Sequence, residues 1–251
     1  MTRRMESMVL RLADAVIAVW HIFPYAAEYC KKYVCDVPPD AADIRVCVTA
    51  DDIAYERAKS EKEDVAAGRA VQRFSDEYLE TLAIYRKIAE RMPDHNTILF
   101  HGSVIAVDGE GYLFTAKSGT GKSTHTRLWR ERFGERAVMV NDDKPLIRIA
   151  DGAAYAYGTP WNGKHHLDTD IAVPLKGLCI LSRAKENHIE PADRRAAYPM
   201  IVQQTYRPSD PRGIIRTMEL IDGLMDSVRI YSLGCNMDLD AALTAYNGMQ
   251  V

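Results

Sequence analysis

The run from Ala116 to Thr124, Ala-Lys-Ser-Gly-Thr-Gly-Lys-Ser-Thr, contains the residue types that could bind phosphate. It follows the GxxxxGK[ST] pattern of a Walker A loop, except that Ala116 stands where the first glycine is expected. Gly119 and Gly121 would let the backbone turn tightly, so that several N–H groups point at phosphate oxygens. A helix that starts near Lys122 would direct its positive end to the same place. We therefore interpret this run as a phosphate-binding loop.

The side chains of this loop have separate expected roles. Lys122 supplies a flexible cation for the β- and γ-phosphates, and the Ser123 hydroxyl is placed to hold Mg²⁺. The pattern therefore implies ATP and Mg²⁺ as cofactors. The expected nucleotide-binding residues are Ser118, Gly119, Thr120, Gly121, Lys122, Ser123 and Thr124.

Two carboxylates end the next apolar run, Val138-Met139-Val140-Asn141-Asp142-Asp143. An apolar strand that ends in carboxylates shortly after a phosphate loop is typical of a Walker B element, and we expect it beside the strand at 112–115. One aspartate can hold Mg²⁺, and the other can act as a base towards an attacking hydroxyl. A solvated Asp-Asp turn before Lys144-Pro145 is the alternative interpretation.

Histidines and a polar loop supply further candidates. His101 lies at the end of a short strand, where it could orient a carboxylate or share a proton; a purely structural histidine is the alternative. Trp161 and Lys164, within the loop 158–170, offer stacking and charge to a nucleotide or substrate. His165-His166 could suggest a metal site, but adjacent side chains usually point apart, which favours the interpretation that this pair binds no metal.

The surrounding pattern predicts an α/β protein that positions these residues. Asp-Gly pairs at 108–109 and 151–152 predict hairpins, and Gly134 is expected to end a helix. In the helix at 75–92, Tyr78, Leu82, Tyr85, Ala89 and Met92 fall on one face, which we expect to be buried. Helices are expected over 24–35, 51–67, 75–92, 122–133, 192–206, 209–226 and 238–246. Strands are expected near 16–19 and over 44–49, 97–100, 103–107, 112–115, 137–141, 146–149, 153–157, 175–181 and 228–233.

Composition excludes several classes of protein. The 251 residues carry a net charge of -3, without the basic excess of a general nucleic-acid binder. Five scattered cysteines form no CxxC pair, which argues against a zinc site or a disulfide framework. The apolar stretch 8–23 contains Arg11 and Asp14 and is too short to span a membrane, and the start at 1–5 is not followed by a signal-peptide pattern. We predict a cytoplasmic protein that binds neither membrane nor nucleic acid.

His101-Gly102-Ser103, Ala116–Thr124 and Asn141-Asp142-Asp143 together resemble the kinase domain of HPr kinase/phosphorylase in order and spacing. The loop is also similar to that of ATP-dependent phosphoenolpyruvate carboxykinase, and the whole chain looks like small bacterial HPr-kinase-like proteins. The resemblance covers roughly residues 97–180. It implies an α/β fold with a phosphoenolpyruvate carboxykinase/HPr kinase-like P-loop core in 97–251, on which an N-terminal α/β segment, 1–96, packs as a substrate- or partner-docking part.

The same resemblance implies roles for individual residues. Asp142 would be the base that takes a seryl proton, Asp143 and Ser123 would hold the metal, His101 would support Asp142, and Lys122 would act on the phosphates. The Glu-Ile-Arg-Gly-Leu-Gly signature of HPr kinases is not found; Thr159–Lys164 occupies about that region, which argues against HPr itself as substrate and against phosphorylase activity.

These observations favour an ATP-dependent kinase that phosphorylates a hydroxyl, most simply a serine of a protein or peptide. A nucleotide-binding switch that docks a partner without phosphate transfer is the alternative. A carboxykinase-type enzyme is a third hypothesis, for which Arg207, Arg212 and Arg216 could form a carboxylate pocket. The identity of the phosphoacceptor and homo-oligomer formation are left open by the sequence.

Overall fold

A computed structural model describes residues 6–250, so the arginine-containing start at 1–5 lies outside the described residues. The chain divides into two compact units, Met1–Arg91 and Met92–Val251. The α/β class predicted from the sequence is confirmed. That the N-terminal segment packs on the rest and docks a partner stays a prediction. In the part of the chain that is described, no helix is long and apolar enough to cross a membrane.

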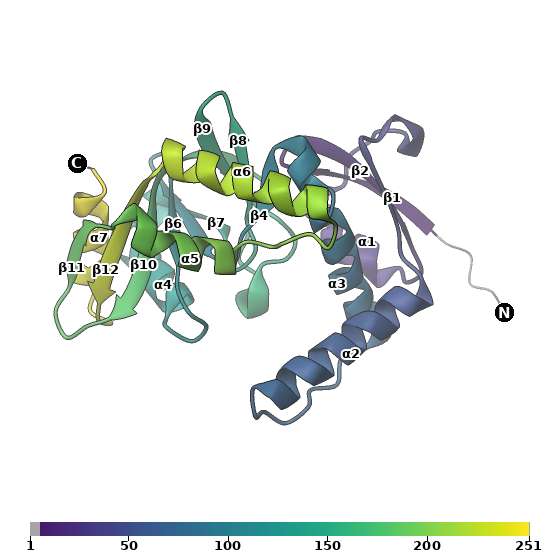
Figure 1. The fold of residues 1–251 in the computed structure, drawn as a ribbon, viewed down its shortest axis with the longest axis horizontal. Helices are drawn as coiled ribbons and strands as arrows, with labels where there is room; N and C mark the ends of the chain where they lie inside the picture. The colour runs from purple at the N-terminus through teal and green to yellow at the C-terminus, as the bar shows by residue number, and fades with distance from the viewer. Residues whose placement is uncertain (1–5, 251) are drawn as a thin grey trace. The chain divides into compact units, whose positions relative to one another are not determined.

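The first unit combines a small sheet with helices (Figure 1). Strand β2 pairs with β1 in the antiparallel and with β3 in the parallel direction. Ser75 caps α3 by accepting a hydrogen bond from the Tyr78 amide, as its position before Asp76 and Glu77 predicts. The elements are β1 (Glu6–Leu12), β2 (Ala15–His21), α1 (Tyr25–Cys30), β3 (Ile44–Cys47), α2 (Ala50–Ala66) and α3 (Asp76–Ala89), with short 3-10 turns at Lys31–Tyr33 and Pro39–Ala41.

The predicted buried face of the helix at 75–92 is confirmed only in part. Ala89 and Met92 are buried, whereas the other three predicted residues, Tyr78, Leu82 and Tyr85, are partly exposed. Leu79, Ile84 and Ile88 are buried instead. The helix carries apolar residues on two overlapping stripes. Packing against α1, α2 and the sheet selects the stripe with the aliphatic side chains.

The second unit contains a nine-stranded sheet. Seven of its strands follow the order β4-β8-β9-β10-β6-β5-β7, β12 pairs with β10, and β11 pairs with β12. Its strands are β4 (Thr97–Leu99), β5 (Ser103–Val107), β6 (Glu110–Thr115), β7 (Ala137–Asn141), β8 (Leu146–Ala150), β9 (Ala153–Tyr157), β10 (Ala172–Arg183), β11 (His188–Pro191) and β12 (Arg229–Cys235). Its helices are α4 (Lys122–Phe133), α5 (Arg194–Gln204), α6 (Pro211–Ser227) and α7 (Asp240–Gly248), with 3-10 turns at Met92–His95, Gly134–Arg136 and Gly163–His165.

Strand β10 joins two parts of this sheet. Its first residues, Ala172–Pro174, pair with β9 in the antiparallel direction. The remainder lies between β6 and β12 and is parallel to both. Both predicted hairpins form: Asp108-Gly109 and Asp151-Gly152 adopt positive φ angles, as two-residue turns of this type require.

Alternating side chains of β6 divide the core between two faces of the sheet. Tyr112 and Phe114 pack with Trp129 of α4 and with residues of α7. Leu113 points to the opposite face and belongs to the cluster that contains residues of α5 and α6. Helix α6 runs across the strands in front in Figure 1. Because helices cover both faces, the strand β6, which leads to the glycine-rich loop at 116–121, is fixed from both sides.

Candidate functional site

The predicted phosphate-binding loop is a tight turn between β6 and α4. Gly119 and Gly121 have φ angles of +76° and +124°, a region that L side chains rarely adopt. The Thr120 amide and hydroxyl both donate to the Lys117 carbonyl, at 3.2 and 2.8 Å, and close the turn. Helix α4 then begins at Lys122, as predicted. The turn therefore connects a strand to the N-terminus of a helix, the strand–loop–helix order of an anion-binding site.

Ala116 fits the position where the sequence pattern expects glycine. It is not among the residues between 6 and 250 that have a positive φ, so its backbone does not require glycine. Its methyl group is fully buried in the apolar cluster that contains Phe114 and Trp129. Alanine at this position therefore adds a packing contact and is compatible with the backbone of the turn.

The Asp-Asp segment lies near this loop through a different pairing from the one expected. Strand β7 pairs with β5, and β5 pairs with β6. The expectation that β7 lies directly beside β6 is therefore wrong. Because β5 is antiparallel to both, β6 and β7 are parallel to each other, and their carboxyl ends still reach the same edge of the sheet.

Asn141 shapes the backbone that carries the two aspartates. Its side-chain oxygen accepts hydrogen bonds from the amides of Asp143, at 2.9 Å, and Lys144, at 2.6 Å. Its side-chain nitrogen donates to the carbonyl and hydroxyl oxygens of Thr159, both at 3.0 Å. Asn141 is fully buried, and its two bonds to Thr159 are buried, whereas those from Asp143 and Lys144 are part-buried. It therefore fixes the turn on which both carboxylates stand.

Asp142 is 5% exposed and is held by hydroxyl groups. Ser103 Oγ lies 2.9 Å from its Oδ1, and Thr126 Oγ1 lies 3.5 Å from the same atom. Burial raises the pKa of Asp142, and hydrogen bonds from Ser103 and Ser123 oppose this only in part. A carboxylate with a raised pKa is a better proton acceptor than an ordinary one.

Asp143 has the opposite environment. Its Oδ1 lies 3.3 Å from His101 Nε2 and 3.7 Å from Lys144 Nζ. Burial acts to raise the pKa of Asp143, but the His101 hydrogen bond and the charges of Lys144 and Lys122 outweigh it, so that the pKa lies below its usual value. His101 thus contacts Asp143, whereas the resemblance implied Asp142 as its partner.

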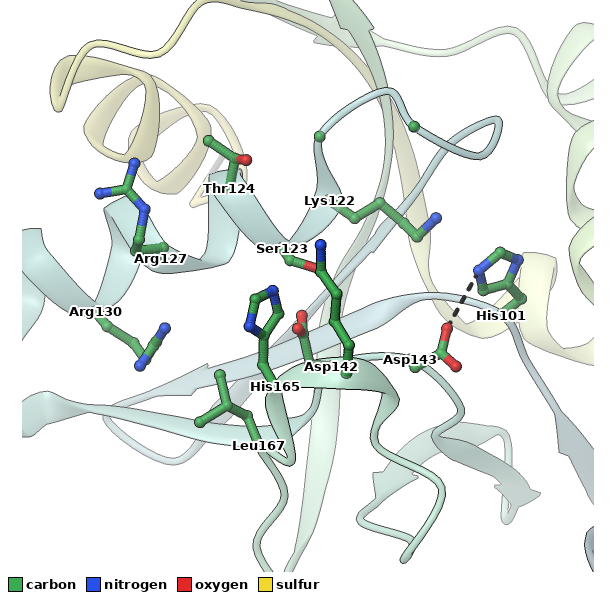
Figure 2. A pocket seen from close by; sticks show the side chains of 13 residues that line it. His101, Lys122, Ser123, Thr124, Arg127, Arg130, Asp142, Asp143, His165 and Leu167 are labelled. Carbon is green, nitrogen blue, oxygen red and sulfur yellow. Dashed lines mark ion pairs between the residues drawn. The ribbon is translucent and has the colours of Figure 1, made fainter. Parts of the chain in front are cut away.

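The loop and the aspartates line one cavity of about 520 Å³ (Figure 2). Lys122 extends towards His101 in this view. Burial lowers the pKa of Lys122, and the charge of Asp143 acts in the opposite direction. Of the predicted site residues, the cavity brings together His101, Gly119, Gly121, Lys122, Ser123, Thr124, Asp142 and Asp143.

The side chains of two predicted nucleotide-binding residues do not line this cavity. Ser118 and Thr120 line a separate depression together with Arg183. The Arg183 side chain donates to the carbonyl of Gly119, at 2.7 Å, and so fastens the loop from that side. The backbone amides of these residues remain part of the same turn, although their side chains do not line the cavity.

The polar loop 158–170 contributes to the cavity through different residues from those expected. Trp161 is 4% exposed and is a core residue, so its predicted stacking role is wrong. Lys164 and His165 do line the cavity. The Asp142 amide donates to the Leu167 carbonyl at 3.1 Å, which ties the loop to the end of β7.

Sequence reasoning missed Arg127 and Arg130, which lie on α4 and line the cavity. Their helical spacing from Ser123, at four and seven residues, was the available signal, because residues so spaced share a helix face. The arginines proposed for a carboxylate pocket, Arg207, Arg212 and Arg216, do not line this cavity. Arg216 instead pairs with Glu219.

The fold and the cavity define an α/β protein with a candidate phosphate-binding loop that faces two carboxylates. Residues 71–246 match the model of the family described as SynChlorMet cassette protein ScmC. Because the match covers more than half of the chain, this protein belongs to the ScmC family.

Among solved structures, the chain is similar to the Hpr(Ser) kinase/phosphatase from Coxiella burnetii, with 11% identity and a TM-score of 0.35. The alignment covers 61% of this chain and 93% of that one. A search of curated proteins finds no match.

Proposed function

We propose that this protein is an ATP-dependent kinase that transfers the γ-phosphate of ATP to a hydroxyl group, that of a serine in a protein or peptide. Its core would then be of the P-loop type shared by HPr kinase and phosphoenolpyruvate carboxykinase. The cytoplasm, which supplies ATP and Mg²⁺, is the proposed location.

One observation carries this proposal: two adjacent carboxylates with oppositely shifted pKa values line the same cavity as the glycine-rich turn. The pKa of Asp142 is raised, chiefly by burial, and the pKa of Asp143 is lowered by His101 and by nearby lysines. A pair whose environments separate their pKa values is typical of sites where one group moves a proton and the other stays charged. A loop that only bound phosphate would need neither the raised pKa of Asp142 nor the lowered pKa of Asp143.

The phosphate groups would be held by the loop 118–124. Its backbone amides and the N-terminus of α4 favour negative charge, and Lys122 adds a cation within the same cavity. This is the arrangement in which a polyphosphate is bound mainly by backbone amides.

The donor set suits Mg²⁺. Ser123 and Asp143 offer a hydroxyl and a carboxylate, and Mg²⁺ prefers oxygen ligands. Within residues 6–250, no group of three or more His, Cys, Asp or Glu side chains could form a complete protein cage. This fits an ion that keeps water and substrate phosphate among its ligands, and such an ion would neutralise phosphate charge.

Asp142 would act as the base. As the acceptor oxygen forms its bond to the γ-phosphorus, the bond from that phosphorus to the bridging β,γ-oxygen breaks and ADP leaves. The acceptor proton passes to the Asp142 carboxylate. Ser103 holds this carboxylate in place, and Lys122 stabilises the charge that develops on the phosphates.

A nucleotide-dependent switch without phosphate transfer is the second candidate. The observation that favours it is the separate compact unit Met1–Arg91, which has its own sheet and could dock a partner. In that case the cavity would bind nucleotide, and Asp142 would have no role in proton transfer.

The test is incubation of the purified protein with γ-labelled ATP, Mg²⁺ and an extract, followed by mass spectrometry of labelled products. The proposal predicts transfer to a discrete acceptor by the wild-type protein, and none by Lys122→Ala. Nucleotide binding without transfer would favour the switch. Absence of nucleotide binding would contradict both candidates.

A further inference from the structure

The cavity contains positive charge beyond what the phosphate-binding loop supplies. In Figure 2, Lys122 and His101 lie on one side of Asp142, whereas Arg127 and Arg130 lie on the other. The second side is therefore a distinct region next to the proposed base, and neither arginine has a role in the mechanism described above.

Arg127 and Arg130 differ in their protein contacts. Arg127 is exposed and donates to Glu131 on the same helix. Arg130 is half-buried, and its Nε atom is buried with no hydrogen-bond acceptor. No carboxylate among residues 6–250 forms an ion pair with it. Because a buried donor without an acceptor is unfavourable, the Nε atom of Arg130 is available to an anionic ligand that enters the cavity.

The surroundings of Arg130 favour an anionic ligand. Lys164 and His165 line the same cavity, where Lys164 adds positive charge and both side chains can donate hydrogen bonds. Helix α4 fixes the backbone from which Arg130 extends, because the neighbouring Leu128 and Trp129 are buried in the core. A guanidinium can bind an oxyanion in a planar, two-bond geometry that lysine cannot reproduce.

We propose, on the basis of the function proposed above, that Arg130 is the centre of an acceptor subsite. This subsite binds an oxyanion that lies close to the hydroxyl to be phosphorylated and so directs that hydroxyl to Asp142. The oxyanion is the carboxylate of an acidic residue that flanks the serine, or a phosphate already present on the same peptide. The protein therefore selects acidic peptide segments.

Peptide sets with a central serine test this directly. At each flanking position in turn, the peptides carry Glu, phosphoserine, Gln or Lys, and initial rates of transfer from ATP are measured. For the wild-type protein we expect at least one position where Glu or phosphoserine gives a rate about 10- to 100-fold above Gln, the range of a charge-assisted hydrogen bond. The Glu and phosphoserine sets distinguish the two sources of the oxyanion.

Variants of α4 assign the preference to one side chain. Arg130→Gln should bring the ratio of acidic to neutral rates close to one, and Arg130→Glu should favour Lys. Arg132→Gln is the matched control, since Arg132 is exposed on the same helix and does not line the cavity. Thermal melts establish whether each variant is folded. If an Arg130 variant does not fold, Arg130→Lys takes its place, with an expected ratio of acidic to neutral rates between those of the wild type and Arg130→Gln.

Each contrary result has a separate meaning. Equal wild-type rates on acidic and neutral peptides would overturn the subsite and leave the kinase function standing. A large loss of ATP affinity in Arg130→Gln, measured by calorimetry, would assign Arg130 to the nucleotide and also overturn it. Transfer to no peptide and to no protein of an extract would contradict the kinase function, and the subsite with it.

Discussion

Replacement of Asp142 by Asn separates the catalytic role of this carboxylate from its effect on stability. Asparagine is nearly the same size, and its oxygen can still accept the hydrogen bond from Ser103 Oγ, which lies 2.9 Å from Asp142 Oδ1. The substitution therefore removes the charge and the proton-accepting capacity while it retains the shape of the site. We expect phosphate transfer to fall by about 100- to 10,000-fold, the contribution of a positioned base.

Although its activity falls, Asp142→Asn should be more stable than the wild-type protein. Burial raises the pKa of Asp142 in the folded protein, so the ionised form is disfavoured there. Stability is then lost as pH rises from the unfolded pKa of about 3.9 through the raised folded pKa. At pH 7 the carboxylate is a net cost, and Asp142→Asn should unfold at a higher temperature than the wild-type protein.

Asp143→Asn is the matched control for this argument. The pKa of Asp143 is lowered in the folded state, so its charge contributes stability that is present above pH 3.9 and is lost as pH falls through the lowered value. This variant should therefore melt below the wild type at pH 7. Melts without nucleotide or Mg²⁺ and single-turnover transfer assays measure both effects. Wild-type transfer by Asp142→Asn would refute the base assignment, and a lower melting temperature would refute the burial argument.

Three further substitutions test the framework of the site. Ser103→Ala removes a hydrogen bond that lowers the pKa of Asp142, so the acidic limb of the pH–rate profile should move to higher pH; an unmoved limb would show that another group controls it. Asn141→Ala leaves the partly buried amides of Asp143 and Lys144 without this acceptor and should lower the free energy of unfolding by about 1–3 kcal/mol in denaturant titrations, with loss of transfer; wild-type values would contradict its positioning role. Gly121→Ala places a side chain at a φ of +124° and should cost about 1–3 kcal/mol and weaken ATP binding, whereas an unaffected affinity would show that this turn does not hold phosphate.

The parts of the fold that sequence predicts well are those with local causes. Helix α4 begins after Gly121 and ends before Gly134, and both glycines adopt positive φ angles that the helix cannot continue through. The two Asp-Gly hairpins follow from the same kind of signal. In contrast, β11 is exposed apart from Ile189, so its four residues carry no apolar alternation to reveal it.

In the candidate site, too, the features with local causes are predictable from the sequence, and those set by tertiary packing are not. Its loop and its Asp-Asp pair are each contiguous in sequence, and their spacing predicts one cavity. Which aspartate His101 contacts depends on how the strand ends are offset, and sequence does not encode that offset locally. The pairing of β7 with β5 and the burial of Trp161 are likewise decided by tertiary packing. Arg130 enters the site for the same reason.

The central claim is that the turn at 118–124 binds the phosphates of a nucleotide, and titration calorimetry with ATP and Mg²⁺ tests it most directly. We predict saturable binding of one nucleotide per chain, weakened about 10- to 100-fold in Lys122→Ala because a hydrogen bond to a charged group is lost. No detectable heat of binding with any adenine or guanine triphosphate, for a protein shown to be folded, would contradict the account.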